Sequence, residues 1–152
     1  MNLKKEFQLD PQKMRDGVWF DMEAGAPVYD EAEVERLRSR GVPCVKARPM
    51  GNLNREYKTR LEDLLRPLRR QRRRKGDREM EEVVEKKITE AASYDVIIDF
   101  FNIEDDDVPL ENTPEAKAAA MNKYPDLREE WLGYGLQTNA FRLEDIEDGV
   151  KN

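Results

Sequence analysis

Apolar side chains recur at helical spacing between residues 53 and 68. Their intervals of three and four place them on one face of a helix. The positions are Leu53, Tyr57, Leu61, Leu64, Leu65 and Leu68. Asn52 or Asn54 is suited to cap this helix, which we expect to run to about Leu65. Pro67 then interrupts it, because proline lacks the amide hydrogen that a helix interior needs.

The same period continues in a longer segment after residue 77. Its apolar positions are Met80, Val84, Ile88, Ala91, Tyr94 and Ile98. Asp77 can cap this helix, and the pattern predicts a helix from about Arg78 to Phe101. Because it is the longest periodic segment, we expect it to form the centre of the core.

Two shorter helices are predicted after an acidic loop over residues 102–112. Thr113-Pro114-Glu115 is typical of a helix start, with a capping hydroxyl, proline in the first turn and an acidic residue near the positive end of the helix dipole. This helix should end near Lys123. Pro125 opens another, with Leu127 and the aromatic residues of the segment facing inward, and Asn139 is a plausible end.

The first 50 residues favour short strands. Gly17–Asp21 and Val42–Arg48 read as β-segments, and Pro43 confines the second to a strand start or a sheet edge. Between them, residues 23–27 indicate a turn. Asp30 can cap a short helix over Glu31–Ser39. The stretch before Gly17 is polar and is expected to be loose.

Together these elements predict an α+β fold in one domain over residues 1–152. It should be mainly α-helical, with a small N-terminal antiparallel β-sheet packed on three or four helices. We expect a β-rich part over residues 1–50, a helical part over 51–140 and an acidic tail over 141–152. The helical part should supply most of the core.

Composition limits both the core and the location of the protein. Charged residues make up 39% of the chain and hydrophobic residues 38%, so the core should be modest. No apolar run approaches the length of a membrane span, and the first residues do not resemble a secretory signal. The one cysteine, Cys44, is expected to act as a small hydrophobic residue in a strand. These features favour the cytoplasm.

Several catalytic classes lack their usual residues. Histidine is absent, which removes the commonest general base and the commonest metal ligand. No glycine-rich phosphate loop and no nucleophile elbow occurs. Glu104 to Glu115 has the length of a calcium-binding loop, but Pro109 occupies the position that requires glycine. We therefore expect no enzymatic activity, no cofactor and no metal.

Charge is divided along the chain. Residues 1–78 hold 20 Lys and Arg against 13 Asp and Glu, a net charge of +7, whereas residues 79–152 hold 7 against 20, a net charge of −13. The strongest feature is a basic run comprising Arg69, Arg70, Arg72, Arg73, Arg74 and Lys75. It could contact the acidic half of the chain, an acidic protein surface or nucleic acid, or it could simply be solvated. No aromatic residue is interleaved with it, which argues against stacking on single-stranded nucleic acid.

Some of the aromatic residues could belong either to the core or to a binding surface. They are Trp19, Phe100, Phe101, Trp131 and Tyr134. Aromatic residues at helical spacing are usually core residues. One or two could instead lie on a binding face, where tryptophan and tyrosine dominate binding energy. Trp131 and Tyr134 are the candidates for partner contact.

The order of these segments resembles that of the tail assembly chaperones of long-tailed bacteriophages. The shared pieces in the first half are the strand at residues 17–21, the strand that ends Lys46-Ala47-Arg48, Gly51-Asn52, the helix from Asn54 and Leu65-Arg66-Pro67. In the second half they are residues 96–100, Val108-Pro109-Leu110, Asn112–Glu115 and Asp126-Leu127-Arg128. Phe100 stands where that family usually has tryptophan, and residues 27–41 resemble an insertion between the two strands.

The resemblance implies a morphogenetic role in the bacterial host cytoplasm. Such a protein binds the phage tape measure protein and helps the tail tube protein to assemble around it. The residues themselves leave two alternatives open. One is a nucleic-acid-binding regulator that uses the Arg69–Lys75 run, and the other is a structural component of the virion, such as a head–tail connector.

Overall fold

The computed structural model describes residues 1–71 and 76–143. Its α-helices are α1 (Leu3–Phe7), α2 (Pro11–Asp16), α3 (Glu31–Ser39), α4 (Arg55–Leu65), α5 (Leu68–Gln71), α6 (Asp77–Asp95), α7 (Pro114–Lys123) and α8 (Pro125–Gly135), and a 3-10 turn covers Thr138–Phe141. Its strands are β1 (Val18–Asp21), β2 (Ala26–Val28), β3 (Cys44–Ala47), β4 (Ile97–Phe101), β5 (Glu104–Asp105) and β6 (Val108–Pro109). Among these residues, no helix is long and apolar enough to cross a bilayer.

Four strands form one antiparallel sheet in the order β2-β1-β3-β4. Phe20 of β1 lies opposite Val45 of β3, which in turn lies opposite Phe100 of β4. Side chains alternate between the two faces of a strand. Val18 therefore shares a face with Phe20, and both are buried with Val45.

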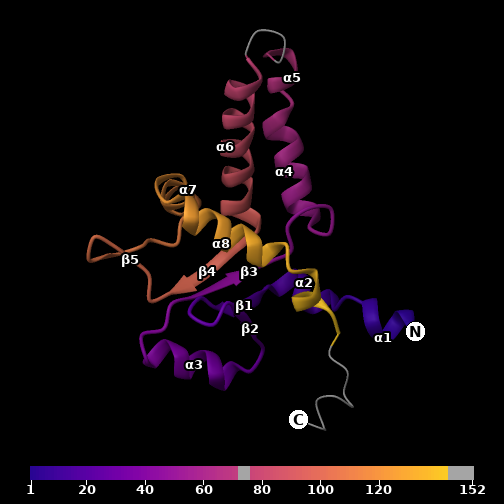
Figure 1. Cartoon of the computed structure of the whole chain (residues 1–152), viewed down its shortest axis with the longest axis vertical. Coiled ribbons are helices and arrows are strands. Elements are labelled where there is room, and N and C mark those ends of the chain that lie inside the picture. The colour runs from indigo at the N-terminus through magenta and orange to yellow at the C-terminus, as the bar shows by residue number, and fades with distance from the viewer. Residues whose placement is uncertain (72–75, 144–152) are drawn as a thin grey trace.

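Helix α8 and the C-terminal part of α6 contribute to the core on this face. The ring of Trp131 stacks on Phe100 at 5.8 Å, and the ring of Tyr134 stacks on Phe20 at 4.5 Å. Gly135 brings α8 close to the rest of the core, because a Cβ there would meet Val96 Cγ1 at 2.9 Å. Helix α3 lies at the other side of the sheet, away from α6 (Figure 1).

The outer edge of β4 is closed by side chains. The ammonium group of Lys117 in α7 donates to the Ile97 carbonyl at 2.6 Å, and the Asn112 amide donates to the Ile98 carbonyl at 3.3 Å. Lys117 is buried, and this burial lowers the pKa of its ammonium group. These contacts occupy carbonyl groups that an exposed edge strand would offer to another chain.

A long helical hairpin rises from the sheet. Helices α4 and α5 lead away from it, and α6 returns beside them (Figure 1). In the same view α7 and α8 lie near the base of the hairpin, so its distal part extends beyond the other described elements.

The predicted fold class is confirmed: the protein is mainly helical with a small antiparallel sheet. The sheet is not confined to the N-terminal part, however, because β4 comes from residues 97–101. The predicted helix from Arg78 to Phe101 is therefore wrong in its last six residues. Ile97 and Ile98 are β-branched and pair well in a sheet, and β3 offers an open edge for them.

Smaller differences lie near the predicted turns. Ala26–Val28 pairs with β1, although residues 23–27 were expected to form a turn. The stretch before Gly17 forms α1 and α2, each capped by an Asn or Asp side chain. The acidic loop contains the β5–β6 hairpin. The helix at Glu31–Ser39 and the helix that follows the Thr113 cap are confirmed.

Candidate functional site

The helical hairpin α4–α6 carries the basic run and is the candidate site. Its base is fixed by Asn54, which is buried. The Asn54 Oδ1 atom accepts from the Tyr57 amide at 3.1 Å and so caps α4. Its Nδ2 atom donates to the Asp95 carbonyl at 2.7 Å, where α6 ends. One side chain therefore joins the start of α4 to the end of α6.

An ion pair strengthens the same junction. Arg60 donates from Nε to the Asp95 carboxylate at 2.7 Å, and its guanidinium lies 4.1 Å from the centre of the Tyr94 ring. The hydrogen bond to Asp95 raises the pKa of Arg60. The basal part of the hairpin is therefore held by specific polar contacts as well as by the sheet.

The distal part is held differently. Its apolar side chains are only half-buried, apart from Leu68, which is buried. The half-buried set is Leu61, Leu64, Leu65, Met80, Val83, Val84 and Ile88. We call these residues and Leu68 the hairpin seam. Two helices cannot fully enclose their shared apolar residues, so the half-buried residues of the seam remain partly in contact with solvent.

The described residues of the basic run, Arg69 and Arg70, lie at the distal end of the hairpin. Arg69 and Arg70 are exposed in α5, and neither makes an ion pair with another residue in the described part of the chain. Arg66, just before α5, pairs with Asp63 at 3.0 Å. The remaining predicted residues of the run, Arg72, Arg73, Arg74 and Lys75, lie outside the described residues.

Trp131 and Tyr134 are core residues, which corrects their place among the partner-binding candidates. Trp131 is fully buried, and Tyr134 is 3% exposed. Burial also raises the pKa of the Tyr134 hydroxyl. Their spacing along α8 is that of a buried helix face, and the stacking on Phe100 and Phe20 is what covers them. Neither side chain can reach a partner without disrupting the core.

The acidic loop and Cys44 were the other residues considered for a chemical role, and both have a structural environment that accounts for them. Asp105 in the acidic loop accepts from the Tyr124 hydroxyl at 2.5 Å and from Lys123 at 3.0 Å, and these hydrogen bonds lower its pKa. Cys44 is buried, which raises the pKa of its thiol to about 11. Across residues 1–71 and 76–143, no group of three Cys, Asp or Glu side chains is placed to hold a metal ion.

A family model described as YdaY prophage protein matches residues 52–152. The chain belongs to this family. No curated protein and no solved structure matches the chain. A phage or prophage origin is therefore established. The resemblance described from the sequence implies the same origin.

The YdaY match covers the candidate site. It begins just before α4 and includes the hairpin, β4, α7 and α8. Residues 1–51, which hold β1 to β3 and α3, lie outside it. The family is thus shown by the part of the chain that contains the basic run, the hairpin seam and most of the helices that pack on the sheet.

Proposed function

We propose that the protein is a non-enzymatic tail assembly chaperone. In this role it binds the tape measure protein in the host cytoplasm and assists assembly of the tail tube protein. The observation that carries the proposal is the distal hairpin, where a half-covered apolar seam ends beside exposed arginines. The prophage family and the resemblance to tail assembly chaperones agree with it.

The hairpin suits a long helical client for a physical reason. An amphipathic helix can cover a flank of the seam with its own apolar face, as helices do in bundles and helix-in-groove complexes. Arg69 and Arg70 would attract acidic residues on the client, and such attraction chiefly raises the association rate. Half-burial keeps the seam adaptable, because every seam residue except Leu68 keeps part of its surface in solvent, even though Leu61 and Leu64 also pack against the core.

Co-expression with the tape measure protein of the same prophage tests this proposal. We expect a soluble complex on affinity purification, with the tape measure protein insoluble when it is expressed alone. The variant Arg69→Glu/Arg70→Glu should lower the yield of complex, and the matched variant Arg15→Glu/Arg40→Glu, which changes the same charge on other elements, should not. No complex with the unaltered protein would refute the proposal.

Salt separates the contribution of the arginines from that of the seam. The screening length is about 8 Å at physiological ionic strength. If Arg69 and Arg70 steer the contact, association should slow as salt increases, and the double glutamate variant should lose this dependence. A salt-independent complex would assign recognition to the seam alone.

Nucleic-acid binding is the second candidate, because two arginines without ion pairs in the described part of the chain are also available to phosphates. Retention of the unaltered protein on DNA or RNA, lost in Arg69→Glu/Arg70→Glu, would favour this regulator over the chaperone. A structural role in the virion predicts instead that the protein is present in purified particles at fixed stoichiometry.

A further inference from the structure

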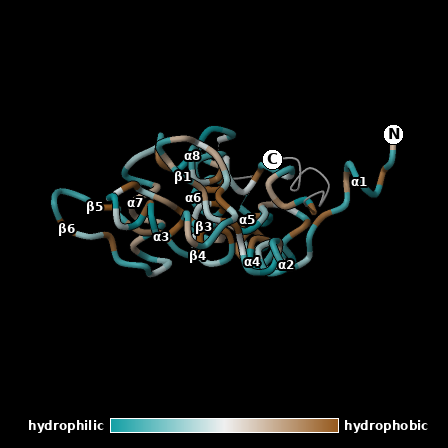
Figure 2. Tube along the Cα trace, turned by 90° about the horizontal axis from the view of Figure 1, so that it is seen from below, coloured by the Kyte–Doolittle hydropathy of each residue, from teal (hydrophilic) through white to brown (hydrophobic). Residues whose placement is uncertain are grey.

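The N-terminal arm, residues 1–7, exposes apolar side chains that nothing in its own helix can cover. Helix α1 has five residues and buries none of them. Leu3 is 69% exposed and Phe7 is 52% exposed. A helix this short is marginal in water without tertiary contacts. Figure 2 shows α1 extending away from the rest of the molecule. The arm therefore has the character of a segment that packs against another surface.

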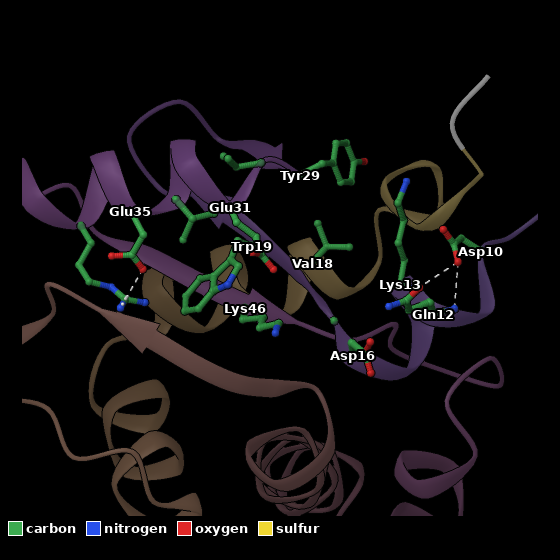
Figure 3. Close-up of a pocket in the computed structure, with 14 residues that line it drawn as sticks. Asp10, Gln12, Lys13, Asp16, Val18, Trp19, Tyr29, Glu31, Glu35 and Lys46 are labelled. Atoms are coloured by element: carbon green, nitrogen blue, oxygen red, sulfur yellow. Dashed lines mark hydrogen bonds and ion pairs between the residues drawn. The ribbon is translucent and has the colours of Figure 1, made fainter. Parts of the chain in front are cut away.

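A groove beside α2 has an apolar part in its lining that suits such exposed apolar side chains. We call it the Trp19 groove. Its volume is about 510 Å³, and α2, β1, β2, α3 and β3 contribute to its lining. The apolar part of the lining is Val18, Trp19, Val28 and Val34. In Figure 3 the Trp19 ring lies beneath α3, with Lys46 nearby. Clefts of this size accommodate several side chains.

The arm does not lie in the groove of its own chain. Directly after α1, the Leu143 amide donates to the Gln8 carbonyl at 2.9 Å, and the Asp10 amide donates to the Phe141 carbonyl at 2.8 Å. Leu9 forms a β-bridge with Arg142 between these bonds. The chain is thus fixed where the arm begins, and α1 points away from α3 (Figure 1). In this arrangement the groove is left open to the arm of another molecule.

Charge supports this match between the arm and the groove. The α3 side of the groove is lined by Glu31, Glu35 and Arg38, and Lys13 and Lys46 line it elsewhere. Glu35 pairs with Arg38 at 3.2 Å, whereas Glu31 has no ion pair within the described residues. Lys4 lies on the arm between Leu3 and Phe7. An arm that seats both apolar side chains would bring this ammonium group towards the acidic wall.

We propose that the N-terminal arm of one molecule docks into the Trp19 groove of a second copy of this chain. Leu3 and Phe7 fill the apolar part of the groove, and Lys4 faces Glu31. Each copy carries one arm and one groove, so two copies can exchange arms reciprocally, or more copies can join head to tail. This association is independent of the proposed chaperone role and uses a different surface.

Sedimentation equilibrium of the full chain tests the proposal. We expect the average mass to rise between about 1 μM and about 500 μM, the range in which a small interface associates. Leu3→Ser/Phe7→Ser should weaken association at least about tenfold, because both apolar contacts are lost. The matched variant Val108→Ser/Leu136→Ser removes side chains that are 65% and 63% exposed elsewhere, and it should associate as the unaltered chain does.

A mixing experiment identifies the acceptor. Glu31→Arg/Glu35→Arg keeps the arm but reverses the charge on one wall of the groove, and it should also associate weakly alone. Mixed with Leu3→Ser/Phe7→Ser, it should regain mass, because one intact arm then meets one intact groove. Trp19 fluorescence should become less accessible to quencher on association, while fully buried Trp131 contributes no change.

Three results would overturn the proposal. One is a monomer throughout the concentration range, and another is unchanged association of Leu3→Ser/Phe7→Ser. The third is a mixture that behaves as the sum of its two components, which would place the acceptor elsewhere. Because none of these variants alters the hairpin, the co-expression result can fail or succeed separately.

Discussion

The two ends of the helical hairpin use similar residues in different ways. At the base, α6 carries Ala91 and Ala92 fully buried against the core, and Asn54 joins α4 to α6 through two hydrogen bonds. Towards the distal end, the leucine, valine and methionine residues of the seam are half-buried, apart from buried Leu68. Apolar content therefore does not determine burial here. Burial depends instead on how many neighbouring helices and strands pack around each residue.

Because of this difference, we expect the base of the hairpin to supply folding stability and the distal end to supply an accessible binding surface. Burial of apolar area supplies most of the folding free energy, so the basal end should dominate the free energy of unfolding. Segments with few buried contacts open more readily, and binding surfaces are often drawn from them. The hairpin thus combines a fixed base with a distal end that can adapt to a partner.

The largest expected effect comes from the core at the base. Trp131→Ala removes a fully buried ring that stacks on Phe100 and should lower the free energy of unfolding by about 3–5 kcal/mol. Chemical denaturation followed by circular dichroism measures the loss. A change below about 1 kcal/mol would mean that α8 does not cover the sheet as described.

The junction should be next in size. Asn54→Ala removes the cap of α4 and leaves the Asp95 carbonyl without its buried donor, at a cost of about 2 kcal/mol. Asn54→Ser is the informative partner variant, since serine can restore the cap but cannot span to Asp95. Equal stability of the two variants would show that the contact between α4 and α6 adds nothing.

Much of the fold could be predicted because local signals and packing agree. Asp30 and Thr113 cap their helices as expected, and both helices follow the predicted bounds closely. The end of α6 could not be predicted in this way. Residues 96–100 continue the helical spacing of apolar residues, and only the open edge of β3 turns Ile97 and Ile98 into a strand.

The candidate site was predictable only in part. Arg69 and Arg70 are exposed as a basic run suggests, because nothing in composition would bury two adjacent arginines. Trp131 could not be separated from a surface tryptophan by spacing alone, since its burial depends on Phe100 from a distant strand. The Trp19 groove was missed altogether, because five separate elements build it.

A seam substitution should cost less than either basal change. Leu64→Ala removes a half-buried side chain and should lower the free energy of unfolding by about 1 kcal/mol. Hydrogen exchange sharpens the comparison, because distal α6 amides should exchange faster than those near Ala91 and Ala92. Uniform protection along α6 would show that the two ends of the hairpin unfold together.

A smaller effect should appear in the dependence of stability on pH. Burial lowers the pKa of Lys117 below its value in the unfolded chain, so in the folded protein this group releases its proton at lower pH. Between the two pKa values the unfolded state binds more protons, and stability should therefore rise with pH. Subtracting the profile of Lys117→Met isolates this contribution from other groups. A difference that does not change towards pH 10.5 would contradict the burial of a charged Lys117.

The smallest effect on stability should come from the distal arginines. Arg69→Ala/Arg70→Ala removes exposed side chains without ion pairs to other described residues, so the unfolding midpoint should not move. Arg60→Ala is the basal counterpart. It removes the pair with Asp95 and should cost about 1 kcal/mol, which allows for solvent screening of a side chain that is 42% exposed. Thermal unfolding in low and high salt distinguishes the two. If the distal pair proved as costly as Arg60, those arginines would be holding the hairpin together, and they would no longer be available to a partner.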